Sequence, residues 1–326
     1  MKDFWTHFPL VQQQLIETSL LIENKINIRN KEIERALLEL NHSGGKMLRP
    51  AFFFIFAQMG NKEQQNQQQL VKIAASLEIL HMATLVHDDI IDDSPLRRGT
   101  QTIQSKYGKD VAVYTGDLLF TEFFDLLADT MKGSDFLRIN AHSMKRLLLG
   151  ELDQMYTRYN KHITVTDYLR SVTGKTAELF SLSCIEGAHF GHAPKEVEKL
   201  ASRIGRHIGI AFQIYDDILD YSATEVVLKK PTIEDISQGV YTLPLIFALE
   251  EHSSLLAPYL DKQELITVEE ANEVAALVHQ LNGVSKAKEF AGRMTEKALS
   301  DIEKLPPCDS TKQLKMLTEL LLGRSY

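Results

Sequence analysis

Apolar side chains recur every three to four residues along most of this chain, as in residues 10–22 and 33–40. Such spacing places the apolar residues on one face of an α-helix, whereas a half-buried strand requires strict alternation. Alternating runs are scarce, and glycine and proline, which most often interrupt helices, number only 17 and 9 among 326 residues. We therefore predict an all-α fold.

Turn-forming residues divide the chain into pieces of helical length. They occur near residues 42–45, 60–62, 94–95, 132–134, 191–194, 230–231 and 306–307. None of these breaks is a long linker and the composition does not shift across them, so we predict a single domain over residues 1–326. Residues 51–59 are apolar nearly all round, which indicates a buried, central helix.

Net charge and the first residues limit the expected partners and location. With a formal net charge of -8, the chain has no overall attraction to nucleic acid or to an anionic membrane, so an anionic ligand requires local positive charge. Residues 1–5 lack the pattern of a secretory signal, and no apolar run approaches the ~20 residues that span a bilayer. Cys184 and Cys308 have no partners at zinc spacing. We expect a cytoplasmic protein with two ordinary thiols.

Two acidic clusters with the same spacing are the strongest candidates for a functional site. They are Asp88, Asp89 and Asp92, and Asp216, Asp217 and Asp220. On a helix, residues four apart share a face, so each cluster projects carboxylates together. Like charges at this spacing repel, and such sparse oxygen ligands suit Mg²⁺ that also binds substrate phosphate. Either cluster alone is better explained by a solvated acidic face, but the pair, flanked by apolar residues, favours a metal site.

Basic residues in four short motifs provide local positive charge. The motifs are Gly44-Gly45-Lys46-x-x-Arg49, Arg97-Arg98-Gly99, Lys175-Thr176 and Lys229-Lys230. Glycine permits a ligand to approach the backbone, lysine supplies a point charge, and arginine offers a planar fork that matches phosphate. Each motif alone is an ordinary turn or a solvated charge. Together with the two acidic clusters, they predict a diphosphate site.

The order of these motifs resembles that of the all-trans polyprenyl diphosphate synthases over nearly the whole chain. Further motifs in the same order are Glu78-x-x-His81, Gly116-Asp117, Gly150-Glu151-x-x-Gln154, Gln213 before the second acidic cluster, and Thr242-Leu243-Pro244. The chain most resembles the larger, aspartate-rich subunit of bacterial hexaprenyl and heptaprenyl diphosphate synthases, which make menaquinone side chains. The resemblance implies a helical bundle around a central apolar cavity. It also implies a homodimer, or a heterodimer with a small regulatory subunit.

The resemblance further implies a role for each matching residue. Three Mg²⁺ ions that clasp an allylic diphosphate would be bound by Asp88, Asp89, Asp92, Asp216, Asp217 and Asp220. The same leaving group would contact Arg97, Lys175 and Lys230. The diphosphate of the second substrate, isopentenyl diphosphate, would be held by Lys46, Arg49, His81 and Arg98. The reacting carbons would be faced by Thr176 and Gln213, which complete a catalytic group with Lys175, Asp88, Asp92 and Asp216.

The chemistry implied is ionisation of the allylic diphosphate, attack by the isopentenyl double bond on the carbocation, and loss of a proton. Bound cations would neutralise the charge that develops on the departing diphosphate, in a site that excludes water. In this family the released diphosphate removes the proton, so no side chain is expected to serve as an essential general base. The hydrophobic product suggests transient membrane contact.

Product length is expected to depend on small residues before the first acidic cluster. Shorter-chain relatives tend to carry a bulky residue at the position of Ala83, whereas Ala83 and Thr84 leave the path open and favour a long product. Farther along the same helix lie Leu80, Ile79 and Ser76. The far end of the chamber would be closed by Phe120, Phe123 and Phe124, although ordinary core packing explains these rings equally simply.

The chain departs from the family pattern at three places. Met47 replaces a basic residue, Lys229 and Ile233 stand at glycine positions, and Val240 replaces a lysine near the diphosphate. A terpene cyclase or head-to-head synthase is the enzymatic alternative, but the Gly-Gly-Lys-x-x-Arg motif serves isopentenyl diphosphate and argues against it. A non-catalytic subunit would have lost aspartates, and none is lost. A third alternative is an acidic helical protein that binds no ligand, and it would show no magnesium-dependent affinity for diphosphate.

Overall fold

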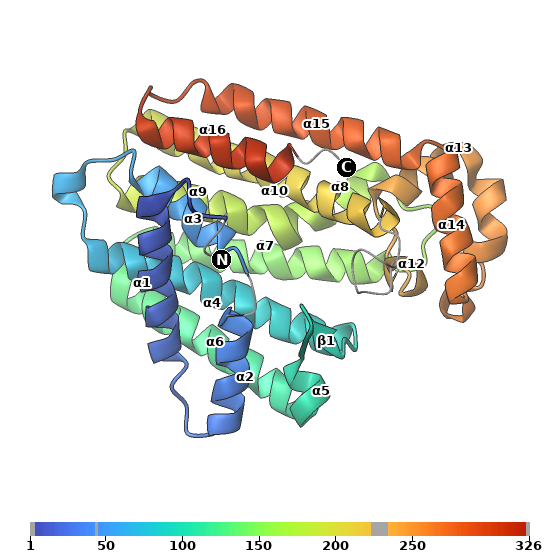
Figure 1. Cartoon of the computed structure of the whole chain (residues 1–326), viewed down its shortest axis with the longest axis horizontal. Helices are drawn as coiled ribbons and strands as arrows, with labels where there is room; N and C mark the ends of the chain where they lie inside the picture. The colour runs from blue at the N-terminus through green and yellow to red at the C-terminus, as the bar shows by residue number, and fades with distance from the viewer. Residues whose placement is uncertain (1–3, 43–44, 223–233, 324–326) are drawn as a thin grey trace. The chain divides into compact units, whose positions relative to one another are not determined.

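The computed structural model describes residues 4–42, 45–222 and 234–323, and helices make up most of this range (Figure 1). Within the range, strands β1 (Leu96–Arg97) and β2 (Thr100–Gln101) form one short antiparallel hairpin. The all-α prediction is therefore confirmed.

Contacts divide the chain into two compact units, each assembled from separate segments. Unit 1 comprises residues 1–141, 183–201 and 306–313, and unit 2 comprises residues 142–182, 202–305 and 314–326. The expectation of a single domain over residues 1–326 stays a prediction.

The elements wholly within unit 1 are α1 (Pro9–Lys25), α2 (Lys31–His42), α3 (Leu48–Ala57), η1 (Lys62–Gln64), α4 (Gln67–Ile91), β1, β2, α5 (Ile103–Tyr107) and α6 (Lys109–Thr130). Those wholly within unit 2 are α8 (Val165–Val172), the π-helix η2 (Thr173–Ala177), α12 (Glu234–Ser237), α13 (Leu243–Leu260), η3 (Gln263–Leu265), α14 (Val268–Gln280) and α15 (Gly283–Ile302). The remaining helices have residues in both units and are α7 (Phe136–Tyr156), α9 (Glu178–Phe190), α10 (Lys195–Ser222) and α16 (Asp309–Leu322).

The expected breaks that lie within the described residues fall between helices, whereas the breaks between α1 and α2, between α7 and α8, and between α13 and α14 were not expected. The break at residues 230–231 lies outside the described residues.

Several helices begin where a side chain can accept a hydrogen bond from the first turn. Asn66 accepts from the Gln69 N–H at 3.2 Å before α4, and Thr164 and Thr267 form capping boxes at the starts of α8 and α14. Such a cap typically stabilises a helix by about 1 kcal/mol. The caps explain why these helices start at these residues.

The core of unit 1 contains the apolar helix α3. Its residues from Phe52 to Phe56 have no exposed surface, which confirms the prediction of a buried helix. α9 approaches α3 closely because Gly187 lacks a side chain. A Cβ at Gly187 would lie 2.1 Å from the Phe53 carbonyl oxygen, so only glycine fits this contact.

α4 carries the apolar pattern further than expected. An 18-residue window of this helix has a mean hydropathy of 1.4, and 78% of that window is buried inside the protein. The expectation that no apolar run approaches the length of a membrane span is therefore wrong for α4. α4 is long and apolar enough to span a bilayer because most of its surface is buried in the core of the protein. A buried core helix is apolar on nearly all sides, as a membrane helix is.

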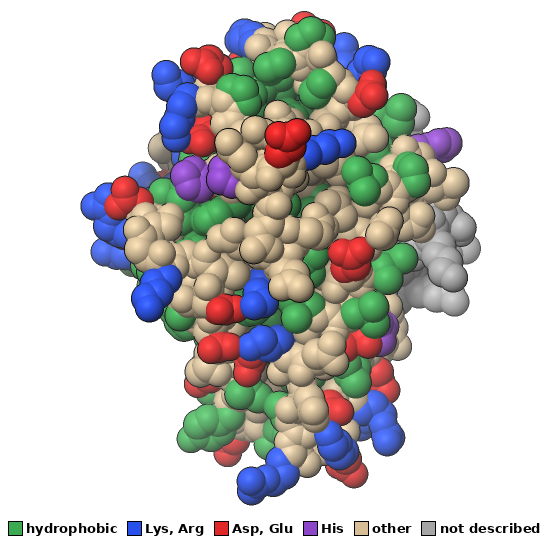
Figure 2. Space-filling model, turned by 90° about the vertical axis from the view of Figure 1, so that its left-hand side faces the viewer, with side chains coloured by type: hydrophobic (Ala, Val, Ile, Leu, Met, Phe, Trp, Pro, Cys, Tyr) green, Lys and Arg blue, Asp and Glu red, His purple; other side chains and the backbone are tan. Residues whose placement is uncertain are grey.

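Charged side chains at the surface lie mostly beside charges of the opposite sign. On the face shown in Figure 2, Lys and Arg alternate with Asp and Glu, and hydrophobic side chains lie between them. Exposed pairs such as Lys195 with Glu198 at 2.8 Å are each worth about 0–1 kcal/mol. These surface ion pairs therefore contribute little to the stability of the fold.

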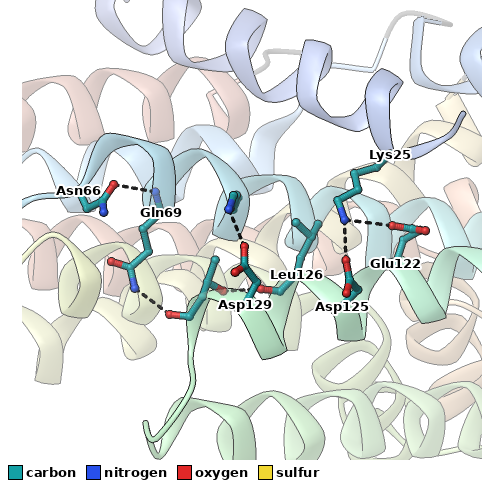
Figure 3. Close-up of polar contacts among 9 residues, drawn as sticks. Lys25, Asn66, Gln69, Glu122, Asp125, Leu126 and Asp129 are labelled. Carbon is teal, nitrogen blue, oxygen red and sulfur yellow. Dashed lines mark hydrogen bonds and ion pairs between the residues drawn. The ribbon is translucent and has the colours of Figure 1, made fainter.

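Polar contacts join α6 to α1 and α4 (Figure 3). Lys25 on α1 binds Asp125 at 2.5 Å and Glu122 at 3.5 Å on α6. At the last residue of α6, the Thr130 carbonyl oxygen accepts a hydrogen bond from the Gln69 side chain at 2.7 Å. This bond joins the C-terminal end of α6 to the first turn of α4, the helix that ends in the first acidic cluster.

A glutamate lies fully buried in unit 1. Asn140 Nδ2 donates to Glu186 Oε1 at 2.5 Å, whereas Glu186 Oε2 has no hydrogen-bond partner among the described residues. Burial raises the pKa of Glu186 from 4.5 to about 8, although the bond from Asn140 opposes this shift. Glu186 is therefore mostly protonated at neutral pH.

Glu186→Gln is expected to stabilise the protein at pH 8 but not at pH 5. A carboxyl with a raised folded-state pKa contributes stability that is complete below its ordinary pKa of 4.5 and is lost as the pH rises toward 8. Glutamine keeps the shape and removes this loss, so the variant should unfold several degrees above the parent at pH 8. Thermal unfolding from pH 5 to pH 8.5 measures the difference, and the same substitution at exposed Glu196 should leave the melting temperature unchanged. A difference independent of pH would contradict the assignment.

Candidate functional site

The first acidic cluster lies at the C-terminal end of α4. Asp88 and Asp89 are in the last turn, and Asp92 is the C-cap residue, whose N–H donates to the Asp88 carbonyl oxygen at 2.9 Å. The helical hydrogen bond thus continues through Asp92. Asp93 follows with φ 50°, which turns the chain away from the helix axis. Asp88 and Asp92 therefore lie one helical turn apart, as their spacing predicted.

Asp89 is the buried member of the first acidic cluster and binds an arginine. Arg97 donates to Asp89 Oδ1 from Nε at 2.8 Å and from Nη2 at 2.7 Å. The hairpin presents Arg97 through a two-residue turn at Arg98 and Gly99, where both residues have positive φ (53° and 80°). Glycine suits such a turn, and its geometry matches the twist of the strands. Arg97, expected from the resemblance to contact the leaving group, here binds the acidic cluster itself.

Two arginines lie near a buried glutamate, Glu78, on α4. Burial raises the pKa of Glu78, and the positive charges of Arg49 and Arg98 oppose that shift. Burial lowers the pKa of Arg49 to about 10, with Glu78 opposing and Arg98 contributing. Burial, Arg49, Arg98 and Arg97 together hold the pKa of His81 well below 6.5, so the imidazole is neutral at pH 7. Arg49 and Arg98, both predicted to bind diphosphate, therefore lie close together, and their two positive charges exceed the single negative charge of Glu78.

The sequence predicts no role for Glu78, which belongs to the motif Glu78-x-x-His81. One oxygen, Oε2, accepts no hydrogen bond within the described part of the chain. A buried carboxyl one helical turn before a histidine, on an otherwise apolar helix, is the signal that identifies it. Its negative charge offsets part of the repulsion between Arg49 and Arg98.

The loop before α3 brings Gly45 and Lys46 to the same group. A Cβ at Gly45 would lie 2.8 Å from Arg98 Nη1, so the guanidinium rests against the glycine backbone. The Lys46 carbonyl oxygen accepts a hydrogen bond from Trp5 Nε1 at 3.1 Å. Gly44, the other glycine of the motif, lies outside the described residues.

The second acidic cluster lies on α10, in unit 2. Asp217 is buried and accepts hydrogen bonds from Tyr168 Oη at 2.5 Å and from Gln213 Nε2 at 2.8 Å. Thr176 Oγ1 in turn donates to Gln213 Oε1 at 2.7 Å. Burial raises the pKa of Asp217 to about 7, the two hydrogen bonds oppose this, and the carboxylates of Asp216 and Asp220 add to it. Thr176 and Gln213, expected to act together, are connected directly.

Asp235 on α12 belongs to the same acidic group. Burial and then the carboxylates of Asp220 and Asp217 raise the pKa of Asp235 well above its ordinary value, and Lys175 opposes them. The sequence analysis assigned no role to Asp235 or to Tyr168. Lys230, predicted to bind the leaving group, lies outside the described residues together with Lys229 and Ile233.

Lys175 and Thr176 lie on the π-helix η2, a rare conformation that is frequent at functional sites. Lys175 Nζ binds Glu151 Oε2 of α7 at 3.0 Å. Beside this pair, α7 and η2 approach closely because Gly150 faces Gly174: a Cβ at Gly150 would lie 2.5 Å from the Lys175 backbone nitrogen. The Gly-Glu-x-x-Gln motif thus supports the predicted leaving-group lysine.

The donor set of each cluster fits a hard divalent cation. Within the described ranges, no group of three or more His, Cys, Asp and Glu side chains is arranged so that it could hold a metal ion by itself. Magnesium does not require one, because it commonly binds one or two carboxylates together with water and substrate phosphate. The mutual repulsion among Asp216, Asp217 and Asp220, seen in the raised pKa of Asp217, is the kind that a bound cation relieves.

The residues expected to set product length lie in the interior of unit 1. Leu80 and Ala83 have no exposed surface, and Thr84 donates to the His81 carbonyl oxygen at 2.8 Å. Across from them on α6, Phe123 is fully buried, whereas Phe124 is 47% exposed and contributes less to any enclosed chamber. Phe120 stacks on His87, with ring centroids 5.3 Å apart.

Known proteins are similar to this chain in both sequence and fold. Residues 30–279 match the polyprenyl synthetase family. The chain is 32% identical over 305 residues, 94% of each chain, to heptaprenyl diphosphate synthase component 2 of Geobacillus stearothermophilus. It is 31% identical, over 93% of each chain, to the geranylgeranyl diphosphate synthase of Saccharolobus solfataricus.

Solved structures of similar proteins cover almost the whole chain. The geranylgeranyl pyrophosphate synthase from Lactobacillus brevis is 41% identical with a TM-score of 0.95, over 99% of this chain and 100% of that one. The heptaprenyl diphosphate synthase from Staphylococcus aureus is 32% identical with a TM-score of 0.89, over 96% of this chain and 98% of that one.

Proposed function

Because this chain belongs to the polyprenyl synthetase family and is a trans-prenyltransferase, we propose that it adds isopentenyl diphosphate head-to-tail to an allylic diphosphate. Farnesyl or geranylgeranyl diphosphate is the proposed primer. The observation that carries the proposal is the presence of two aspartate clusters together with the neighbouring residues Arg49, His81 and Arg98. One set suits metal-bound diphosphate and the other suits diphosphate bound directly.

The allylic diphosphate is proposed to bind through Mg²⁺ held by Asp88, Asp89, Asp92, Asp216, Asp217 and Asp220, with three ions per site. When bound, the ions would neutralise the charge on the leaving group. Lys175, Arg97 and Lys230 would add positive charge to the same group. The hydrogen bonds from Tyr168 and Gln213 fix the orientation of the Asp217 carboxylate, which supports this role.

Isopentenyl diphosphate is proposed to bind to Lys46, Arg49, His81 and Arg98. A neutral His81 donates or accepts a hydrogen bond without adding charge, while the two arginines carry the anion. No side chain is assigned as a general base, so the released diphosphate would take the proton. Thr176 and Gln213, connected at 2.7 Å, would line the reacting carbons.

The proposed product is a medium- or long-chain polyprenyl diphosphate used for menaquinone side chains. The similarity to a heptaprenyl diphosphate synthase component and the small residue at Ala83 favour it. Geranylgeranyl diphosphate is the second candidate, because the Lactobacillus brevis structure at 41% identity carries that name. We further propose that the protein acts as a homodimer, or together with a small second subunit, as the name component 2 of its relative suggests. The proposed location is the cytoplasm, with transient membrane contact.

The test uses the purified chain with Mg²⁺, radiolabelled isopentenyl diphosphate, and farnesyl or geranylgeranyl diphosphate, with products sized by chromatography. Elongation beyond twenty carbons supports the long-chain proposal, and arrest at geranylgeranyl diphosphate supports the second candidate. Activity that appears only when a small subunit is added would show that the chain depends on a partner. Cyclic products without incorporation of label would overturn the proposal.

Ala83→Tyr is expected to shorten the product, because residue 83 is fully buried one turn before Asp88 and a phenol ring there would block a chain growing along α4. Replacement by Ser, Leu and Tyr should shorten the product stepwise as side-chain volume rises. The length distribution on chromatography is the measurement, and circular dichroism verifies folding. An identical distribution in folded Ala83→Tyr would remove residue 83 from the product path.

A further inference from the structure

An aromatic cluster near the N-terminus contacts the loop that carries Lys46. The rings of Phe4 and Trp5 meet edge to face with centroids 4.8 Å apart, and those of Trp5 and Phe8 are 5.7 Å apart. Trp5 and Phe8 have no exposed surface. The cluster and the loop both belong to unit 1. The first residues described are therefore packed against a proposed substrate-binding loop.

Trp5 holds the backbone of this loop. Its indole Nε1 donates to the Lys46 carbonyl oxygen at 3.1 Å. The next residue, Met47, has φ 48°, a left-handed conformation that side chains disfavour, and its carbonyl oxygen accepts from the Ala51 N–H at 3.0 Å to start α3. The indole bond on one side and the helix on the other maintain this conformation. Together they set the direction in which the Lys46 side chain leaves the loop.

Phe4 contacts the side chain of the same lysine. The Lys46 ammonium lies 4.5 Å from the centroid of the Phe4 ring. A cation within ~6 Å of an aromatic face is attracted by the ring quadrupole. The ammonium has three N–H donors, so it can stay near the ring while it donates to a phosphate oxygen. Phe4 thus orients Lys46 without competing with an anionic ligand.

We propose that Phe4 and Trp5 are positioning residues for the diphosphate of isopentenyl diphosphate, acting through Lys46. The inference rests on the proposed role of Lys46 in binding that diphosphate. A lysine already oriented loses less side-chain freedom on binding, which raises affinity. Core packing alone would bury Trp5, but it requires neither the indole bond to the Lys46 carbonyl oxygen nor an ammonium over the Phe4 ring.

Steady-state kinetics of three variants test the proposal. Lys46→Ala should raise KM for isopentenyl diphosphate by about 10- to 100-fold, because a charged partner of the ligand is removed. Trp5→Phe keeps an aromatic ring but loses the indole N–H, and should raise the same KM by about two- to tenfold. Phe4→Leu keeps apolar volume but loses the π face, and should raise it by about two- to fivefold. KM for the allylic substrate and kcat should stay unchanged in Trp5→Phe and Phe4→Leu.

Phe8→Leu is the matched control, because Phe8 belongs to the same buried cluster and contacts Trp5 rather than the loop. It should lower the melting temperature and leave both KM values unchanged. If Lys46→Ala raises KM for isopentenyl diphosphate but Trp5→Phe and Phe4→Leu do not, the positioning role is overturned. If Lys46→Ala itself has no effect, the proposed role of Lys46 fails instead.

The fluorescence of Trp5 offers an independent readout, since it is the single tryptophan of the sequence. Titration of the whole protein with isopentenyl diphosphate, without metal or allylic substrate, should give a saturable change in emission. Phe4→Leu should shift the midpoint to about two- to fivefold higher concentration, in parallel with KM. If calorimetry detects binding but the Trp5 emission does not change, the proposed role of Trp5 in positioning Lys46 for the ligand is overturned.

Discussion

Asp92→Asn is expected to lower kcat/KM for chain elongation by about 10²- to 10³-fold, the usual effect of removing one group that stabilises developing charge. The N–H of Asp92 closes the last turn of α4 on Asp88, and asparagine retains that backbone bond and the side-chain shape. The substitution therefore removes negative charge with little change of structure. Initial rates at increasing Mg²⁺ concentration are the measurement, and the variant should also need more Mg²⁺ for half-maximal rate.

Asp93→Asn is the matched control for this prediction. Asp93 is the next residue, is well exposed, and pairs with Lys109 at 2.9 Å. Asparagine tolerates the positive φ of 50° at this position, so the turn should be kept. The rate should remain within about twofold of the parent, as expected for loss of a surface ion pair. Equal losses at Asp92 and Asp93 would mean that general acidity at the end of α4 matters, and not the predicted spacing.

Gly150→Ala is expected to lower kcat by about 100-fold, because displacement of a catalytic group by about 1 Å has effects of this size. The new Cβ would lie 2.5 Å from the Lys175 nitrogen, 2.8 Å from the Ser171 carbonyl oxygen and 2.9 Å from the Gly174 carbonyl carbon. All three are backbone atoms, which cannot rotate away. The π-helix must therefore move with Lys175 and Thr176. The strain should also destabilise the fold by about 1–3 kcal/mol.

Gly292→Ala offers the contrasting case within unit 2. Gly292 lies inside α15, and a Cβ there would meet nothing within 4 Å. Alanine is the better helix former by up to about 1 kcal/mol, so this variant should be slightly more stable and fully active. Thermal unfolding and kcat measured side by side separate the two glycines. Full activity in Gly150→Ala would show that η2 does not depend on close contact with α7.

The sequence allowed correct prediction of features that depend on neighbours along the chain. Apolar periodicity predicted the helical fold, turn-forming residues predicted several of the helix ends, and four-residue spacing predicted that Asp88 and Asp92 lie one helical turn apart. The same local rules apply to the buried helix α3. They misjudged α4, since a helix buried on all sides reaches the apolar length of a membrane span.

Features that depend on contacts between distant residues were not predictable. Tyr168 reaches Asp217 across 49 positions, and Glu78 matters because Arg49 and Arg98 converge on it. Asp235 joins the second acidic cluster from a separate helix. Gly150 and Gly174, which meet beside the π-helix at Lys175, come together only in the folded chain. In each case the contact is specified by tertiary packing and not by spacing along the sequence.

The interleaved composition of the two units bears on how the protein is made. Unit 1 includes residues 306–313, and unit 2 includes residues 314–326, so neither unit is complete until these last segments have been synthesised. Contacts between segments so far apart in sequence slow folding and leave apolar surface exposed meanwhile. The nascent chain should therefore depend on chaperones for longer than a protein whose domains are consecutive. No gene fragment produced by a single cut encodes either unit alone.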